Sequence, residues 1–108
     1  MGRLESQFQL ELKKTLEVMF PGCIVLKNDA QLKPGIPDLV ILWRSKWALL
    51  EVKKSATAKE RPNQSWYVEK ANQFSYGAFI HPENAEEILN ELQQAFRAPR
   101  SARYASRE

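Results

Sequence analysis

Two short apolar segments separated by a polar turn constrain the fold of this chain more than any other feature of its sequence. The first is Leu39–Trp43, the second is residues 47–53, and Arg44-Ser45-Lys46 lies between them. Both segments are rich in aliphatic, β-branched and aromatic side chains, which favour strands. A turn this short joins antiparallel neighbours, so the pattern predicts a β-hairpin whose first strand is buried.

Helical and strand-like patterns continue on both sides of this hairpin. Before it, residues 4–20 carry apolar side chains at helical spacing, and the short apolar stretch 23–27 predicts a strand. After it, Pro62 and Pro82 each suit the first turn of a helix, and the stretch 75–80 between the two helices predicts a fourth strand. The sequence therefore predicts an α/β protein with a mixed four-stranded sheet flanked by helices, in the order α-β-β-β-α-β-α.

Length and composition fit a single compact domain. The chain has 108 residues, of which 44% are hydrophobic. This is enough for one domain with its own core and too little for two. No apolar run approaches the roughly 18 residues that a membrane span needs, and no secretory signal stands at the start. We therefore expect a soluble, cytoplasmic protein.

The net charge of +3 is concentrated at the C-terminal end. Residues 1–96 carry 12 Lys and Arg against 12 Asp and Glu, whereas residues 97–108 carry four arginines and one glutamate. The last segment consists largely of alanine, serine and arginine, which cannot bury enough surface to fold alone. We expect a folded domain over residues 1–96 and a flexible basic tail over residues 97–108.

Charged residues stand together at one end of the predicted hairpin. Along residues 47–53 the side chains alternate between faces, so Glu51 and Lys53 share a face at the end of an otherwise apolar strand. Asp38 directly precedes the other strand. A two-residue loop would place Asp38 opposite Glu51, whereas a three-residue loop would place it opposite Val52 unless a bulge intervenes. The sequence leaves both registers open.

Two carboxylates brought close together repel each other, by about 4 kcal/mol at 4 Å and an effective dielectric constant of about 20. A shared divalent cation is the usual reason for such a pair, and oxygen ligands with room for water suit Mg²⁺ or Mn²⁺ rather than zinc. Lys53 would then orient an attacking water or stabilise developing negative charge. The set Asp38, Glu51 and Lys53 favours metal-dependent hydrolysis, with a solvated salt bridge as the alternative.

The same residues resemble a known family. Gly35-Ile36-Pro37-Asp38, the apolar strand after it, and Glu51-Val52-Lys53 resemble the PD-(D/E)XK nuclease superfamily. The similarity is closest to its VRR-NUC branch, small phage and bacterial nucleases related to Holliday-junction resolvases, and it runs over about residues 4–96. It implies a restriction-endonuclease-like fold. It also implies metal ligation by Asp38, Glu51 and the Val52 backbone carbonyl, with Lys53 as the catalytic lysine.

The resemblance implies two further site residues. An acidic residue is expected on the first helix in a Glu-x-x-apolar-Gln pattern, which Glu5-Ser6-Gln7-Phe8-Gln9 fits. Glu5 is therefore the preferred acid, acting on the metal directly or through water. Glu11 is the alternative, because shorter relatives space this acid closer to the first strand. Gln64 lies on the buried face of the second predicted helix, where a polar side chain needs a partner, and the family has a glutamine near this point.

The resemblance implies an endonuclease that acts on DNA with Mg²⁺ or Mn²⁺, in which water attacks and a 3′ oxygen leaves. Branched DNA such as a four-way junction is the expected substrate, and a homodimer is expected because a symmetric junction needs two active sites. We expect no membrane or small-molecule partner, and a bacterial or phage-infected cell as the setting. The residues expected to bind DNA are basic and follow the second hairpin strand or lie in the tail: Lys54, Lys59, Arg61, Arg97, Arg100 and Arg103.

Two other functions remain open at this stage. A non-catalytic DNA-binding module would have the same fold, but a degenerate copy has no need to keep Asp38, Glu51 and Lys53 together. A structural or protein-interaction subunit would use the acidic helix 83–96 as its contact face.

Overall fold

The computed structural model of the protein describes residues 2–29 and 34–98. Its elements are α1 (Gly2–Met19), β1 (Ile24–Lys27), β2 (Leu39–Trp43), β3 (Lys46–Val52), α2 (Gln64–Phe74), β4 (Tyr76–Ile80) and α3 (Ala85–Arg97). The predicted α/β class, the order of elements and the mixed four-stranded sheet are confirmed. No helix within these two ranges is both long and apolar enough to cross a membrane.

The second and third helices begin later than the sequence predicts. Pro62 and Pro82 lie in turns that precede the helices and not in their first turns. Before α2, the Arg61 N–H donates to Gln64 Oε1 at 2.7 Å, and before α3 the side chain of Asn84 accepts a backbone N–H in the same way. These side chains close the turns by accepting backbone N–H groups, so each helix starts only after its turn is complete.

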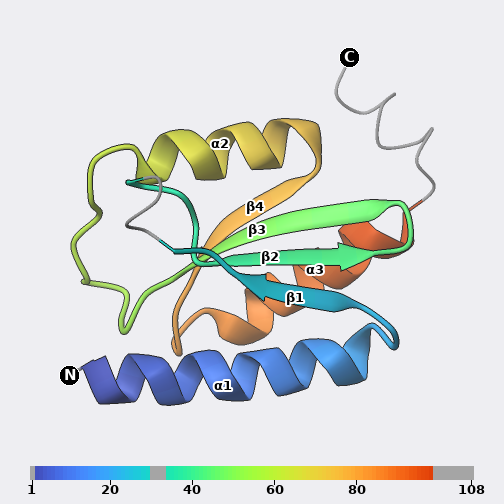
Figure 1. Cartoon of the computed structure of the whole chain (residues 1–108), viewed down its shortest axis with the longest axis horizontal. Coiled ribbons are helices and arrows are strands. Elements are labelled where there is room, and N and C mark those ends of the chain that lie inside the picture. The colour runs from blue at the N-terminus through green and yellow to red at the C-terminus, as the bar shows by residue number, and fades with distance from the viewer. Residues whose placement is uncertain (1, 30–33, 99–108) are drawn as a thin grey trace.

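The sheet has the strand order β1-β2-β3-β4. The pairs β1–β2 and β2–β3 are antiparallel, whereas β3 and β4 are parallel and are connected through α2. α1 and α3 lie against one face of the sheet and α2 lies against the other (Figure 1). This crossover brings the start of α2 to the end of the sheet at which β3 finishes.

The main core lies between the sheet and the helices α1 and α3. At the end of α1, the ring of Phe20 packs 5.1 Å from the ring of Trp43 and 5.0 Å from the ring of Phe96, measured between centroids. Trp43 also donates its indole N–H to the Pro21 carbonyl at 2.9 Å. This aromatic cluster packs the turn end of the β2–β3 hairpin into the core. Asp38 and Glu51 lie at the other end of the hairpin.

α2 packs closely on the sheet at Gly77 of β4. A Cβ atom at this position would lie 2.5 Å from the Val68 carbonyl oxygen and 2.7 Å from Ala71 Cβ, both in α2. These separations are shorter than side chains tolerate, so glycine sets the distance between helix and sheet. The same distance determines how far Gln64, the first residue of α2, reaches toward β3.

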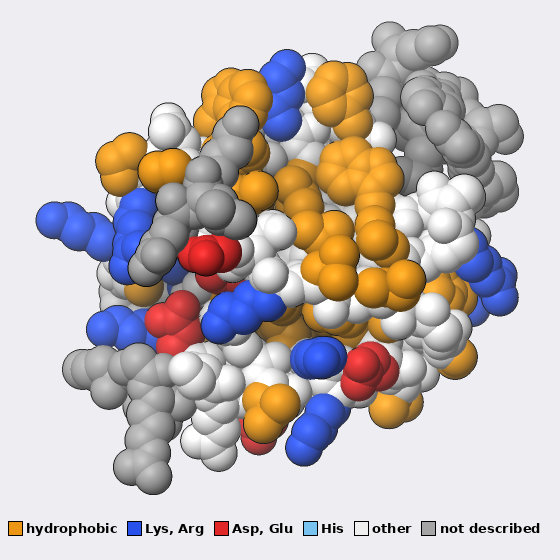
Figure 2. Space-filling model, viewed as in Figure 1, with side chains coloured by type: hydrophobic (Ala, Val, Ile, Leu, Met, Phe, Trp, Pro, Cys, Tyr) orange, Lys and Arg blue, Asp and Glu red, His pale blue; other side chains and the backbone are white. Residues whose placement is uncertain are grey.

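α2 leaves part of its face of the sheet uncovered. Ile24, Leu26 and Leu42 have 54%, 49% and 37% of their surface exposed, and the pairing of Ile24 with Leu42 places them on one face. Figure 2 shows hydrophobic side chains gathered over the strands on the side of the molecule that it presents. Contiguous apolar surface of this kind is typical of a contact with another macromolecule.

Candidate active site

The β2–β3 hairpin has a two-residue loop. Leu39 pairs with Leu50, and one further step along this register places Asp38 opposite Glu51. Of the two registers that the sequence allows, this is the one that brings the carboxylates together. Asp38 is held in place because its Oδ2 accepts the Val52 N–H at 2.9 Å.

Glu51 is a buried carboxylate with an unused oxygen. Its residue surface is 4% exposed, and its Oε2 accepts a hydrogen bond from Gln64 Nε2 at 2.8 Å. Its Oε1 is also buried and has no hydrogen-bond partner within the described ranges. Burial, followed by the charge of Asp38, raises the pKa of Glu51 from 4.5 to about 8, although Lys53 opposes the shift. A cation beside Oε1 would satisfy that oxygen and favour the ionised form.

Lys53 is fixed at the centre of a hydrogen-bond network. Its Nζ donates to Gln64 Oε1 at 2.6 Å and to the Lys59 carbonyl at 3.1 Å, and it lies 3.8 Å from Glu51 Oε2. Gln64 is buried, as its helical spacing predicts, and its amide bridges Glu51 and Lys53. The ammonium group is therefore held next to the carboxylate by neutral groups as well as by charge.

The backbone carbonyl of Val52 is a third oxygen close to the two carboxylates in the hairpin register. The Lys53 N–H donates to the Ile80 carbonyl of β4, so the N–H and carbonyl of Val52 point the other way, toward β2. Continuing the hairpin register places Pro37 opposite Val52, and proline has no N–H to donate to the Val52 carbonyl. That carbonyl therefore faces the side on which Asp38 lies and is suited to join the two carboxylates as a ligand.

One open cavity of about 760 Å³ brings the candidate residues together. It is lined by all five candidate catalytic residues, Glu5, Asp38, Glu51, Lys53 and Gln64. It is also lined by three candidate DNA-binding residues, Lys54, Lys59 and Arg61. Glu11 is not among the lining residues, so the structure brings the preferred acid of the first helix to the cavity and leaves the alternative outside.

Two solved structures share this architecture. One, named VRR_NUC domain, has a TM-score of 0.65 and 23% identity, and covers 81% of this chain and 95% of its own. The chain has the VRR_NUC fold. A second structure, named VRR_NUC domain protein, has a TM-score of 0.60 and 16% identity, and covers 84% of this chain and 88% of its own. Comparisons with family models and with curated proteins find no match. The resemblance inferred from the motifs is thus confirmed at the level of the fold.

Within this VRR_NUC fold, three lining residues that come from α1 and β1 were not predicted from the sequence. Ser6 and Gln9 lie on α1 and Lys27 ends β1, and all three border the cavity. Ser6 and Gln9 are three residues apart and therefore share a helix face, close to the face of Glu5. That spacing is the one signal in the sequence that points to them.

Of the basic residues predicted for the tail, the structure describes Arg97 alone, and Arg97 does not line the cavity. Arg97 is the last residue of α3, and its guanidinium lies 5.9 Å from the ring centroid of Trp43, next to the hairpin turn. It therefore stands at the opposite end of the β2–β3 hairpin from Asp38. Arg100 and Arg103 lie outside the described residues.

The donor set fits a hard cation that keeps water ligands. In residues 2–29 and 34–98, no group of three or more His, Cys, Asp or Glu side chains lies close enough to hold a metal ion. A cation would use the carboxylates of Asp38 and Glu51, the Val52 carbonyl and water, with Glu5 reaching it through water. Few protein ligands, all of them oxygens, suit Mg²⁺ or Mn²⁺.

Proposed function

We propose that this chain is a divalent-metal-dependent endonuclease of the VRR-NUC family that hydrolyses phosphodiester bonds in DNA. The observation that carries the proposal is the cluster that the half-buried Asp38 forms with the buried Glu51, Lys53 and Gln64, in which Glu51 Oε1 is left without a partner. A structural salt bridge would have no need of a second carboxylate opposite the first or of an open cavity in front of them.

The residues have separate roles in this reaction. Asp38, Glu51 and the Val52 carbonyl would hold Mg²⁺ or Mn²⁺, with Glu5 attached through water. A metal bound there would lower the pKa of a water and stabilise negative charge on the phosphate. Lys53 orients the attacking water and stabilises the developing charge while the 3′ oxygen leaves. Its Nζ is already held by Gln64 and by the Lys59 carbonyl, so little reorganisation is needed.

The basic side chains around the cavity support DNA as the substrate. Lys54, Lys59 and Arg61 come from the loop between β3 and α2, and all three line the cavity. Positive side chains on the wall of such a site neutralise phosphates. The proposed role of Arg97, Arg100 and Arg103 is to bind DNA away from the cleaved bond.

Branched DNA, a homodimer and action in the cytoplasm of a bacterial or phage-infected cell are parts of the same proposal. A symmetric four-way junction is cut at two places, so two copies of the active site are needed. The uncovered apolar face at Ile24, Leu26 and Leu42 supports a second copy, because apolar surface of this kind is buried when protomers associate.

A panel of DNA substrates tests the proposed activity. Purified protein should cut four-way, flap, nicked or linear DNA in Mg²⁺ or Mn²⁺ and cut none of them in EDTA, with the highest rate on branched DNA. Paired cuts in a four-way substrate within one binding event would support the dimer. Binding without cleavage in either metal would overturn the nuclease and favour the DNA-binding module. Neither binding nor cleavage would favour the interaction subunit.

The acid on α1 provides a second test. Because Glu5 lines the cavity and Glu11 does not, Glu5→Gln should reduce single-turnover cleavage about 10–100-fold, as expected for an outer ligand of a metal site. Glu11→Gln is the matched control and should cleave like the wild type. If both variants cleaved DNA as fast as the wild type, neither acid of α1 would take part in the active site.

A further inference from the structure

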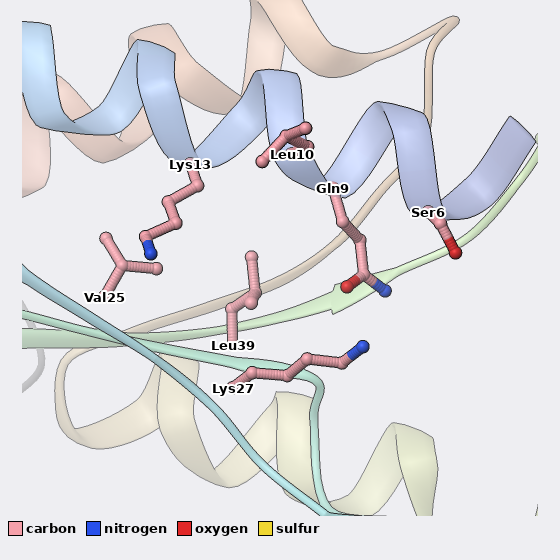
Figure 3. A pocket seen from close by; sticks show the side chains of 7 residues that line it. All are labelled: Ser6, Gln9, Leu10, Lys13, Val25, Lys27 and Leu39. Atoms are coloured by element: carbon pink, nitrogen blue, oxygen red, sulfur yellow. The ribbon is translucent and has the colours of Figure 1, made fainter. Parts of the chain in front are cut away.

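A second cavity, of about 270 Å³, lies between α1 and β1 beside the candidate active site (Figure 3). Three of its lining residues, Ser6, Gln9 and Lys27, also line the larger cavity. The two cavities therefore adjoin and form a continuous groove. We call the smaller part the α1–β1 groove.

Two lysines from different elements give the α1–β1 groove its charge. Lys13 extends from α1 toward β1, and Lys27 extends from β1 beneath Gln9 and Ser6 (Figure 3). Neither lysine forms an ion pair with any residue in the described ranges, and no carboxylate there lines this groove. Two exposed ammonium groups without a counter-charge favour an anionic ligand.

The rest of the groove fits a sugar–phosphate chain better than a small anion. Ser6 and Gln9 offer a hydroxyl and an amide, which are common donors to phosphate oxygens. The remaining lining residues, Leu10, Val25 and Leu39, are apolar. A small anion gains nothing from contact with an apolar surface, whereas the deoxyribose between two phosphates can pack against such a surface.

We propose that the α1–β1 groove binds the backbone of the cleaved DNA strand on one side of the reactive phosphate. Lys27, which borders both cavities, binds the phosphate nearer the cleaved bond, and Lys13 binds the next one along. This inference rests on the proposed function, because it uses the Asp38–Glu51 cluster to mark the cleaved bond. Lys54, Lys59 and Arg61, from the loop between β3 and α2, line the larger cavity, so the strand would continue past that loop.

The salt dependence of DNA binding tests the groove. Lys13→Gln and Lys27→Gln should each reduce the slope of log affinity against log salt by about 0.7–0.9, and the double variant by about 1.4–1.8. Lys14→Gln is the matched control, because Lys14 is an exposed neighbour on α1 that lines neither cavity. Binding is measured in EDTA on one DNA substrate, and a thermal melt of each variant checks that it is folded. Slopes equal to the wild type for the groove variants, or an equal decrease for Lys14→Gln, would overturn the proposal.

Replacing single phosphates of the DNA with uncharged methylphosphonates locates the phosphates that Lys27 and Lys13 contact. A methylphosphonate placed at the position that Lys27 binds should weaken binding of the wild type and not of Lys27→Gln. The position sensitive to Lys13 should lie one phosphate further from the cleaved bond, in the same direction. If the position sensitive to Lys13 and the position sensitive to Lys27 lay on opposite sides of that bond, the proposal would be overturned. These are binding measurements and do not depend on cleavage. If the protein binds DNA in this way without cutting it, the proposed nuclease activity is overturned, whereas the proposal that the groove binds DNA is supported.

Discussion

Replacing Glu51 with glutamine should abolish DNA cleavage while the protein stays folded and continues to bind DNA. The change removes a charge that a metal ion and the reacting phosphate depend on, and losses of about 10²–10³-fold follow from removing one such electrostatic contribution. Asp38→Asn should have the same effect, because the two carboxylates face each other across the hairpin. Single-turnover cleavage in Mg²⁺ is the measurement. Glu69→Gln, on the exposed side of α2, removes the same charge and should leave cleavage unchanged.

The stability of the Glu51→Gln variant separates a catalytic loss from a folding defect. The pKa of Glu51 in the folded protein, about 8, lies above its ordinary value of 4.5. The stability supplied by protonated Glu51 is therefore complete below pH 4.5 and is lost as the pH rises through about 8. The glutamine variant has no such loss, so in EDTA its melting temperature should exceed that of the wild type above pH 8. Retained cleavage, or a lower melting temperature at every pH, would contradict the proposed role.

Gly77→Ala should destabilise the protein and impair cleavage together. The added Cβ would meet the Val68 carbonyl oxygen at 2.5 Å, and a backbone atom cannot move aside without moving α2. Overpacking of this kind costs about 1–3 kcal/mol of unfolding free energy. A displaced α2 would also withdraw Gln64 from Lys53 and Glu51. Urea unfolding and single-turnover cleavage measure the two effects.

Gly22→Ala is the control for that prediction. Gly22 has a φ of +85°, and a Cβ there meets nothing within 4 Å. Alanine at this position should cost about 1–2 kcal/mol of backbone strain and leave cleavage intact. If Gly77→Ala retained full cleavage, or if both variants lost cleavage equally, the packing of α2 would not control the site.

The element order could be predicted because the apolar pattern is strong on every element, but the starts of α2 and α3 could not. Proline is common in the first turn of a helix, and Pro62 and Pro82 carried that signal. The competing signal was a pair of turns closed by the side chains of Gln64 and Asn84. Turns of this type depend on where a side chain points, which a sequence pattern does not record.

The site was predictable to the extent that it lies on the hairpin. Glu51 and Lys53 share a face by strand alternation, Asp38 directly precedes the paired strand, and Gln64 lies on the buried face of its helix by helical spacing. The register did not follow, because the two-residue loop requires Arg44 to adopt a φ of 58°, which residues other than glycine seldom do. Ser6, Gln9 and Lys27 were missed because α1 and β1 form a groove only after they pack, and the shared helix face of Ser6 and Gln9 does not by itself distinguish a site from a solvated surface.

Because Lys53 Nζ donates a hydrogen bond to the Lys59 carbonyl, the proposed catalytic lysine also has a structural role in the loop between β3 and α2. It closes the loop between β3 and α2 from within, while Glu83 Oε1 accepts the Ala56 N–H and holds the same loop from outside. Truncating Lys53 would therefore remove one of the hydrogen bonds that hold the segment carrying Lys54 and Arg61. Weaker DNA binding by such a variant would follow from displacement of this loop. It would not be evidence that Lys53 transfers a proton or stabilises charge at the phosphate.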